Sequence, residues 1–327
     1  VPRAETRSGG RIDTRSKCGI IIKTAVPRRN VPKCLRGGIG ILEMKPMIQK
    51  RALAVHDISC IGKCSLTVAL PILSATGVET SVLPTAVLST HTGGFTGYTF
   101  RDLTDDILPI MQHWKSLNLH VDAIYTGYLG SFRQLELVDE LIDAFRKKDT
   151  VVLIDPVMAD NGVLYASFTP EFVKGMAALC AKADIIVPNL TEACLMLGEK
   201  YRESGYDRAY IEDILKKLSA LGPEKVVLSG ISYTPDKLGS AAYDRSRGEF
   251  YEYFTDRIDG YYHGTGDVFA SALLGAVMNG KTLPEAAKIA VDFTVGSIRR
   301  THEAGTDVKF GVDFEHELPE LIRAIQK

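Results

Sequence analysis

Residues 151–158 of the chain read Val-Val-Leu-Ile-Asp-Pro-Val-Met. The first four are apolar without any polar alternation, which predicts a short strand that is buried on both of its faces. Strands of this kind occur in parallel sheets that helices cover on both sides. Asp155 follows the strand directly, so a carboxylate is expected at the carboxyl edge of such a sheet.

The segments on either side repeat this alternation of short apolar strands and helices. Further strands are expected at 52–55, 80–87, 123–125, 185–187 and 226–228, and a hairpin at 239–243 and 250–254. Helical spacing of apolar residues covers 62–75, 102–117, 136–146, 170–180, 190–197, 213–221, 267–278 and 284–300. The pattern predicts an α/β fold, a three-layer sandwich whose doubly wound, mostly parallel central sheet carries helices on both faces.

Ligands of such sheets bind beyond the carboxyl ends of the strands. The polar residues expected there are Asp57, Thr126, Asp155, Asn189 and Ser229. With 45% apolar and 24% charged residues, the chain of 327 residues has the composition of a folded globular protein. Because no apolar run reaches the ~18 residues of a membrane span and no secretory segment opens the chain, we expect a cytoplasmic protein with reduced cysteines and no membrane partner.

Residues 1–43 differ from the rest of the chain. They hold ten basic residues against three acidic ones, a net charge of +7, so the remainder carries −8 of the overall −1. Without a sustained helix or strand period, 1–43 is predicted to be a disordered basic extension of a domain at 44–327. A cleaved transit segment, or a native start at Met44 or Met47, are the alternatives. The acidic remainder argues against nucleic acid as a partner.

Residues 263–267 read His-Gly-Thr-Gly-Asp and precede the apolar run 268–274. Gly264 and Gly266, at the start of a buried helix, let backbone N–H groups approach an anion closely, and the helix N-terminus adds partial positive charge. Asp267, in the first helical turn, can accept a proton from an attacking hydroxyl group. Taken alone, the motif is equally compatible with a tight turn and an ordinary N-terminal helix acid.

Two more carboxylates follow the strand at 151–154. Asp155 and Asp160 could hold Mg²⁺ and its waters against a triphosphate. Asp160-Asn-Gly also favours a plain solvated turn.

Two further segments have the same double interpretation. Asn189 could line a nucleotide and Glu192 could orient magnesium-bound water, but their spacing also fits a helix capping box. Ser229 and Gly230 could accept a nucleotide phosphate or ribose, or form only a turn.

In their order along the chain, Asp155-Pro-Val-Met, Pro188-Asn-x-x-Glu192-Ala, Ser229-Gly and Gly264-Thr-Gly-Asp267 resemble the motifs of the ribokinase superfamily, and within it those of the pyridoxal and pyridoxamine kinases. The resemblance runs from about residue 51 to the C-terminal helix. It implies a ribokinase-like fold, ATP as phosphoryl donor, Mg²⁺ and a homodimer. K⁺ is the candidate for a monovalent-cation requirement that the sequence leaves open.

The resemblance also implies a role for each matching residue. Asp267 would be the general base on the 5′-hydroxymethyl oxygen of pyridoxal, pyridoxamine or pyridoxine, and Gly264, Thr265 and Gly266 would form the anion hole. Asp155 and Glu192 would serve the metal ion. The residues implied for the nucleotide site are Asp160, Asn189, Glu192, Ser229 and Gly230.

The substrate-side residues implied by the resemblance are Asp57, His91, Thr92 and Tyr128. Thr92 and Tyr128 would contact the pyridine ring, with His91 close by. Asp57 stands where many pyridoxal kinases have a serine, and an acid there could accept from the ring 3-hydroxyl or bind a protonated ring nitrogen. Residues 83–100, rich in Thr and Gly, are expected to form a flap over the substrate.

Rival functions remain open at this point. A hydroxymethylpyrimidine kinase shares the fold, the ATP site and the base, but such enzymes typically have a Gly-rich loop after the first strand, where this chain has one glycine, Gly62. A sugar kinase would need extra N-terminal lid strands. A protein of another class, a non-catalytic ligand-binding module on the same fold, would have no need of Asp267.

Overall fold

The computed structural model describes residues 49–327, which belong to one compact unit. The expected extension at 1–43 and the domain boundary at residue 44 lie outside the described residues.

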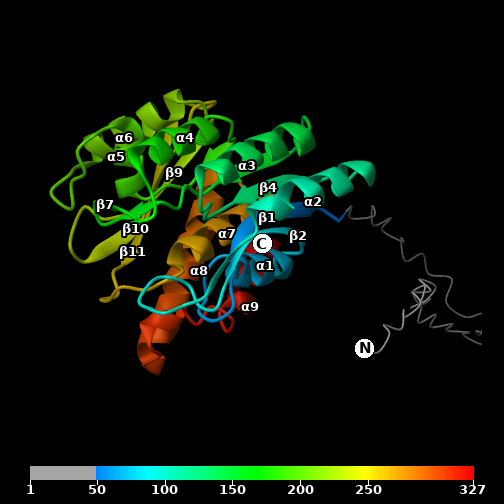
Figure 1. Cartoon of the computed structure of the whole chain (residues 1–327). Coiled ribbons are helices and arrows are strands. Elements are labelled where there is room, and N and C mark those ends of the chain that lie inside the picture. Colours follow the sequence, from blue (N-terminus) through cyan, green and yellow to red (C-terminus); the bar gives the residue numbers. More distant parts are fainter. Residues whose placement is uncertain (1–48) are drawn as a thin grey trace, which may run out of the picture. The chain divides into compact units, whose positions relative to one another are not determined.

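A single nine-stranded sheet forms the centre of this unit, in the order β11-β10-β9-β8-β5-β4-β1-β2-β3 (Figure 1). The strands are β1 Arg51–Ser59, β2 Glu79–Leu88, β3 Phe100–Asp102, β4 Ala123–Thr126, β5 Val151–Ile154, β8 Ile185–Ile186, β9 Lys225–Ile231, β10 Lys237–Asp244 and β11 Glu249–Asp256. The strands from β9 to β2 are parallel to one another, whereas β3, β10 and β11 run antiparallel to their neighbours. A separate small hairpin pairs β6 Ala159–Asp160 with β7 Val163–Leu164.

Helices cover both faces of the sheet. They are α1 Leu66–Ala75, α2 Thr104–Ser116, α3 Phe132–Phe145, α4 Pro170–Cys180, α5 Leu190–Leu197, α6 Arg208–Ala220, α7 Thr265–Met278, α8 Leu283–Ala304 and α9 Leu318–Gln326, with a 3₁₀ turn η1 at Val308–Phe310. In β5, Val152 and Ile154 pack with α2 to α6, whereas Leu153 packs with α1, α7, α8 and α9. This alternation explains why the strand is wholly apolar and confirms the three-layer α/β sandwich.

Two expectations for the N-terminal half were wrong. The helix expected at 62–75 begins only at Leu66, because Ser65 has a φ of 56° and cannot extend the helix toward its N-terminus. The flap expected at 83–100 is too long: Leu83–Leu88 belong to β2 and Phe100 begins β3, so only the loop at 89–99 stays a flap prediction. Apolar residues of β2 are held by parallel pairing with β1, so they are not free to move as a flap.

The sheet has its topological switch point between β1 and β4. The chain passes from β1 to β2 on one side and then returns to β4 on the other, so β1 has parallel partners on both sides. Ligands of doubly wound sheets bind in the crevice outside the carboxyl ends at this point. Asp57 near the end of β1 and Thr126 at the end of β4 are both buried there, and the Thr126 hydroxyl has no hydrogen-bond partner within residues 49–327.

Candidate active site

Helix α7 begins beside this crevice, and its glycine motif is required by geometry. Gly264 caps the helix with a φ of 74°, a left-handed conformation that favours glycine. A Cβ at this position would lie 1.9 Å from the carbonyl oxygen of Lys63, so the backbone there also needs the absence of a side chain. The N–H groups of Thr265, Gly266 and Asp267 open the helix and have no intrahelical acceptor, which leaves them able to bind an anion.

Asp267 is the acid at this helix end. Its Oδ2 atom accepts a hydrogen bond of 2.9 Å from the backbone N–H of Ser65, and only 14% of its side chain is exposed. Burial raises the pKa of Asp267 to about 7, opposed by the Ser65 hydrogen bond and reinforced by the charge of Asp57. Nothing in the sequence indicated this shift. A carboxylate with such a pKa takes up a proton near neutral pH, as a general base must.

Ser65 connects the base to the acid at the end of β1. Its hydroxyl donates to Asp57 Oδ1 at 2.5 Å, while its backbone N–H donates to Asp267. Ser59 donates to the other oxygen of Asp57 at 3.1 Å. Burial raises the pKa of Asp57, and these hydroxyl groups oppose the shift. The positive φ of Ser65 is a strained conformation for a residue with a Cβ, of the kind found at functional sites, and sequence reasoning missed this residue.

Asp155 follows β5 and Glu192 lies in the first turn of α5, and the two carboxylates have different hydrogen-bonding states. Asp155 is buried, and no hydrogen bond from residues 49–327 reaches its carboxylate; burial and then the charges of Glu192 and Asp267 raise its pKa. Glu192 accepts from the backbone N–H groups of Met158 at 3.0 Å and Asn189 at 2.9 Å. The capping-box alternative for Glu192 is therefore observed.

The carboxylates of Asp155 and Glu192 can be compared with the ligands that Mg²⁺ requires. Within residues 49–327, no group of three His, Cys, Asp or Glu side chains could enclose a metal ion. Nucleotide-bound Mg²⁺ keeps several waters and uses one or two carboxylates together with phosphate oxygens. Asp155 fits that arrangement because its carboxylate is unpaired. Glu192 fits only through water, because both of its oxygens already accept hydrogen bonds.

The residues expected around the nucleotide lie at the same carboxyl edge of the sheet. Asn189 and Ser229 form a parallel β-bridge, and Gly230 follows with a φ of 69°. The Asn189 side chain accepts from Glu192 N at 2.9 Å and donates to the Ala159 carbonyl at 2.8 Å, so it fastens the β6–β7 hairpin to α5. On that hairpin, Asp160 accepts a hydrogen bond of 2.7 Å from the Tyr261 hydroxyl, a contact that the sequence did not reveal.

On the substrate side, His91 fastens a loop instead of offering a free ring nitrogen. Its Nε2 donates to the Lys309 carbonyl at 2.7 Å, and its Nδ1 accepts from Gly93 N at 3.1 Å. In the same region the Lys63 N–H donates to the Phe310 carbonyl at 3.0 Å. The loops that carry residues 63 and 91 are thus both held by η1.

Thr92 and Tyr128 complete the expected substrate-side set. Thr92 is exposed on the loop that His91 fastens. Tyr128 is half-buried, packs against Phe168 with ring centroids 5.6 Å apart, and lies near enough to Asp57 for that charge to raise its pKa, after burial as the main cause. Tyr128 and Asp57 can therefore line one ring-sized ligand, while no contact joins Thr92 to them.

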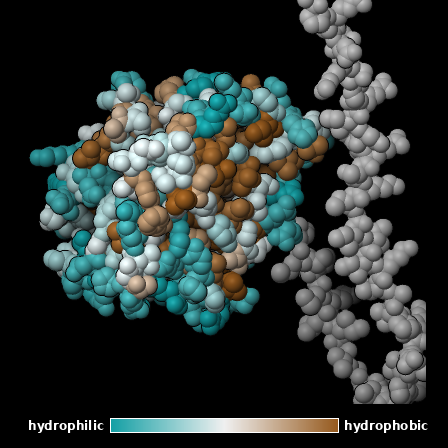
Figure 2. All heavy atoms as spheres, turned by 60° about the horizontal axis from the view of Figure 1, so that its bottom comes forward, coloured by the Kyte–Doolittle hydropathy of each residue, from teal (hydrophilic) through white to brown (hydrophobic). Residues whose placement is uncertain are grey.

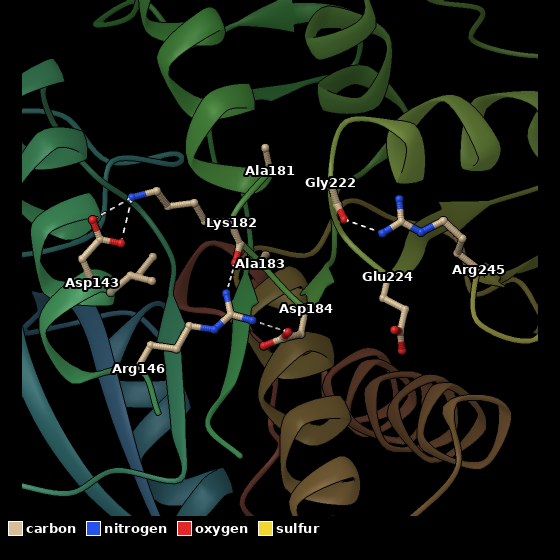
Figure 3. A pocket seen from close by; sticks show the side chains of 10 residues that line it. Asp143, Arg146, Ala181, Lys182, Ala183, Asp184, Gly222, Glu224 and Arg245 are labelled. Carbon is tan, nitrogen blue, oxygen red and sulfur yellow. Dashed lines mark hydrogen bonds and ion pairs between the residues drawn. The ribbon is translucent and has the colours of Figure 1, made fainter. Parts of the chain in front are cut away.

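A cavity of about 380 Å³ lies at the opposite edge of the sheet, beside Asp184 and Glu224, which precede β8 and β9. Figure 3 shows its cationic side chains already engaged: Arg146 with Asp184 and the Lys182 carbonyl, and Arg245 with the Gly222 carbonyl. Because these donors have partners within the protein, the cavity offers no free cation to a phosphate. The candidate site residues lie instead at the carboxyl edge.

Comparison with known proteins identifies the family. Residues 70–311 match the model of a family described as phosphomethylpyrimidine kinase. The pyridoxal kinase of Lactobacillus plantarum is 30% identical with a TM-score of 0.77, covering 84% of this chain and 97% of that protein. The chain belongs to the pyridoxal and phosphomethylpyrimidine kinase family.

Two further relatives refine the comparison within this kinase family. A Bacteroides thetaiotaomicron protein, provisionally described as a phosphomethylpyrimidine kinase and crystallised with pyridoxal, is 40% identical, with a TM-score of 0.80 and coverage of 84% of this chain and 96% of its own. The pyridoxal kinase of Histophilus somni is 29% identical over 253 residues, 70% of this chain and 81% of that protein. The expectation of a ribokinase-like kinase is confirmed. Of the helices in residues 49–327, none combines the length and apolar character needed to cross a bilayer.

Proposed function

We propose that this kinase transfers the γ-phosphoryl group of ATP to the 5′-hydroxymethyl group of pyridoxal, pyridoxamine or pyridoxine. The observation that carries the proposal is the pairing of Asp267 with the N-terminus of α7, because a base with a pKa of about 7 stands beside unpaired backbone N–H groups. The 40% identical relative crystallised with pyridoxal supports a pyridine substrate.

The reaction uses Asp267 and the N-terminus of α7 together. The substrate hydroxyl oxygen forms a bond to the γ-phosphorus, the bond from that phosphorus to the β,γ-bridging oxygen breaks, and ADP leaves. The hydroxyl proton passes to the Asp267 carboxylate. The N–H groups of Thr265, Gly266 and Asp267 stabilise the charge on the transferring group. Asp57, fixed by Ser59 and Ser65, would orient the pyridine ring through its 3-hydroxyl or its nitrogen.

Mg²⁺, when bound, would neutralise phosphate charge, held by Asp155 directly and by Glu192 through water. The nucleotide would lie along Asp160, Asn189, Ser229 and Gly230.

The resemblance further supports a homodimer. K⁺ is the candidate for any monovalent-cation requirement, and the sequence pattern supports a cytoplasmic location and a kinase domain at 44–327. The face drawn in Figure 2 carries hydrophobic residues gathered beside hydrophilic ones, which a dimer would cover in part. Sedimentation at several concentrations tests the dimer, and exchange of K⁺ for Na⁺ tests the cation.

A hydroxymethylpyrimidine substrate is the second candidate, favoured by the description of the matching family. Both substrates present a hydroxymethyl group on a planar nitrogen heterocycle to the same base. The two differ in ring substituents, so the residues that decide between them are Asp57 and Tyr128.

An ADP-release assay with each of the three B6 vitamers and with hydroxymethylpyrimidine distinguishes these functions. Turnover of a vitamer with at least tenfold higher kcat/KM than the pyrimidine is the expected result. Asp267→Asn should bind ATP and pyridoxal but lose most turnover. The matched control is Asp105→Asn, an exposed acid in the first turn of α2, which should turn over normally. Silence with every substrate would indicate a binding module instead.

A further inference from the structure

His56 is a fully buried histidine of β1 whose two ring nitrogens have no hydrogen-bond partner among residues 49–327. A buried polar group without a partner lowers stability, so its nitrogens are expected to gain one in the working enzyme. The ring is closely confined. It stands edge-on to Tyr125, with centroids 4.4 Å apart, and lies against Gly127, where an added Cβ would come within 2.3 Å of Nδ1.

The confined ring faces the base. His56 Nδ1 lies 4.0 Å from Asp267 Oδ1. The other oxygen of Asp267 accepts from Ser65 N, whereas no hydrogen bond from residues 49–327 reaches Oδ1. A movement of about 1 Å would bring the two atoms to the ~2.9 Å of an ordinary N–H···O bond.

The His56 ring is a neutral donor. Burial lowers the pKa of His56 to about 3, so it carries one N–H group and no charge at the pH of the reaction. With a ring nitrogen that is unpartnered within residues 49–327 and lies 4.0 Å from Oδ1, His56 is a side-chain donor placed to serve that oxygen.

We infer that His56 is a positioning residue for phosphoryl transfer: its Nδ1–H donates to Asp267 Oδ1 once both substrates are bound and holds the carboxylate toward the reacting hydroxyl group. The inference rests on the proposed function, because it takes Asp267 as the base. Ser65 then fixes one oxygen and His56 the other, and each oxygen keeps a lone pair for the substrate proton. His56 itself neither gains nor loses a proton.

Substitution of His56 separates this role from packing. His56→Phe keeps a ring but removes the donor, and kcat is expected to fall on the order of 10- to 100-fold, the effect of a reacting group misplaced by about 1 Å. The KM values for ATP and pyridoxal should change less than about threefold, because His56 acts on the base and not on binding. His56→Gln restores an N–H donor and should recover most of the lost kcat. A Phe variant with wild-type kcat, or a Gln variant no better than Phe, overturns the inference.

Two further variants identify the residue through which His56 acts. In the Asp267→Asn background, His56→Phe should cause no further loss of kcat, because the group that it positions is gone. Tyr125→Phe removes a buried hydroxyl from the same cluster, where it contacts Ser271 at 3.5 Å, and should keep kcat within about twofold. An equal loss in Tyr125→Phe would make the effect one of packing. If the wild type turns over none of the vitamers, the proposed function fails; if Asp267→Asn is inactive and His56→Phe is fully active, only this inference fails.

A spectroscopic test does not depend on the folding of His56→Phe. The ¹⁵N spectrum of labelled enzyme with ADP and pyridoxal reports the histidine tautomers, and the His56 signals are those absent from His56→Gln. Protonation at Nδ1 is expected. Protonation at Nε2 overturns the inference, because that tautomer has no hydrogen to offer Oδ1.

Discussion

Replacing Asp267 with asparagine is expected to stabilise the folded protein at the same time as it removes turnover. Burial raises the pKa of Asp267 from 3.8 to about 7, so the native state binds this proton more tightly than the unfolded chain does. The stability of the wild type therefore falls as pH rises from about 4 through about 7 and is constant above that. At about 1.4 kcal/mol per pH unit, the wild type has lost about 2 kcal/mol of stability by pH 5, where only the unfolded carboxyl group ionises, and roughly 4 kcal/mol by pH 8, where the native one ionises too.

Asparagine avoids this cost and still offers an oxygen to the N–H of Ser65. Urea unfolding at pH 5, 6, 7 and 8 should show the variant gaining about 2–3 kcal/mol relative to wild type across that range. The exposed Asp105→Asn control should show no such trend with pH. A variant that is less stable than wild type at pH 8, or whose advantage does not change with pH, would refute the reasoning from burial.

The remaining predictions concern the same edge of the sheet. Gly264→Ala should cost about 1–3 kcal/mol in urea unfolding and lower kcat, because its Cβ would strain a positive φ and meet the Lys63 carbonyl; wild-type stability would contradict this. Asn189→Ala should cost about 1–2 kcal/mol in thermal unfolding and raise KM for ATP, because it removes the side-chain oxygen that accepts from Glu192 N at the start of α5. An unchanged Tm would exclude the capping role. The kcat/KM for pyridoxal should rise with pH to a plateau above about 7 as Asp267 loses its proton, and a flat profile from pH 5.5 to 8 would exclude Asp267 as the base.

Much of the fold could be predicted because local signals agree with tertiary packing. The strand 151–154 and the helices 170–180 and 190–197 were predicted with the bounds observed. Thr169 and Asn189 cap the two helices, and Gly198 ends the second in a left-handed conformation, so each boundary has a chemical cause near in sequence.

Boundaries set by distant contacts could not be predicted. The start of α1 depends on a turn at 60–65 whose Lys63 N–H is bound by Phe310, some 250 residues later in the chain. β3 has three exposed residues and pairs along one edge only, so no apolar alternation marks it.

The features of the candidate site show the same distinction between local signals and distant contacts. The glycine motif predicted the position of Asp267 and its helix end, because both follow from adjacent residues. Its raised pKa and its contact with Ser65 depend on segments 202 residues apart that are buried together. A histidine in an apolar strand looks like a satisfied core residue, and only the structure shows that His56 lacks partners.

The hold of η1 on the loops at 63 and 91 has a consequence for synthesis on the ribosome. The last strand of the sheet ends at Asp256, so the sheet can assemble before residues 308–310 have emerged. The loops that carry residues 63 and 91 can be fixed only after the Lys309 and Phe310 carbonyls that bind them have been made. A chain whose synthesis has not yet passed residue 310 is therefore expected to have a folded sheet while the loops at 63 and 91 still lack the carbonyl groups that fix them.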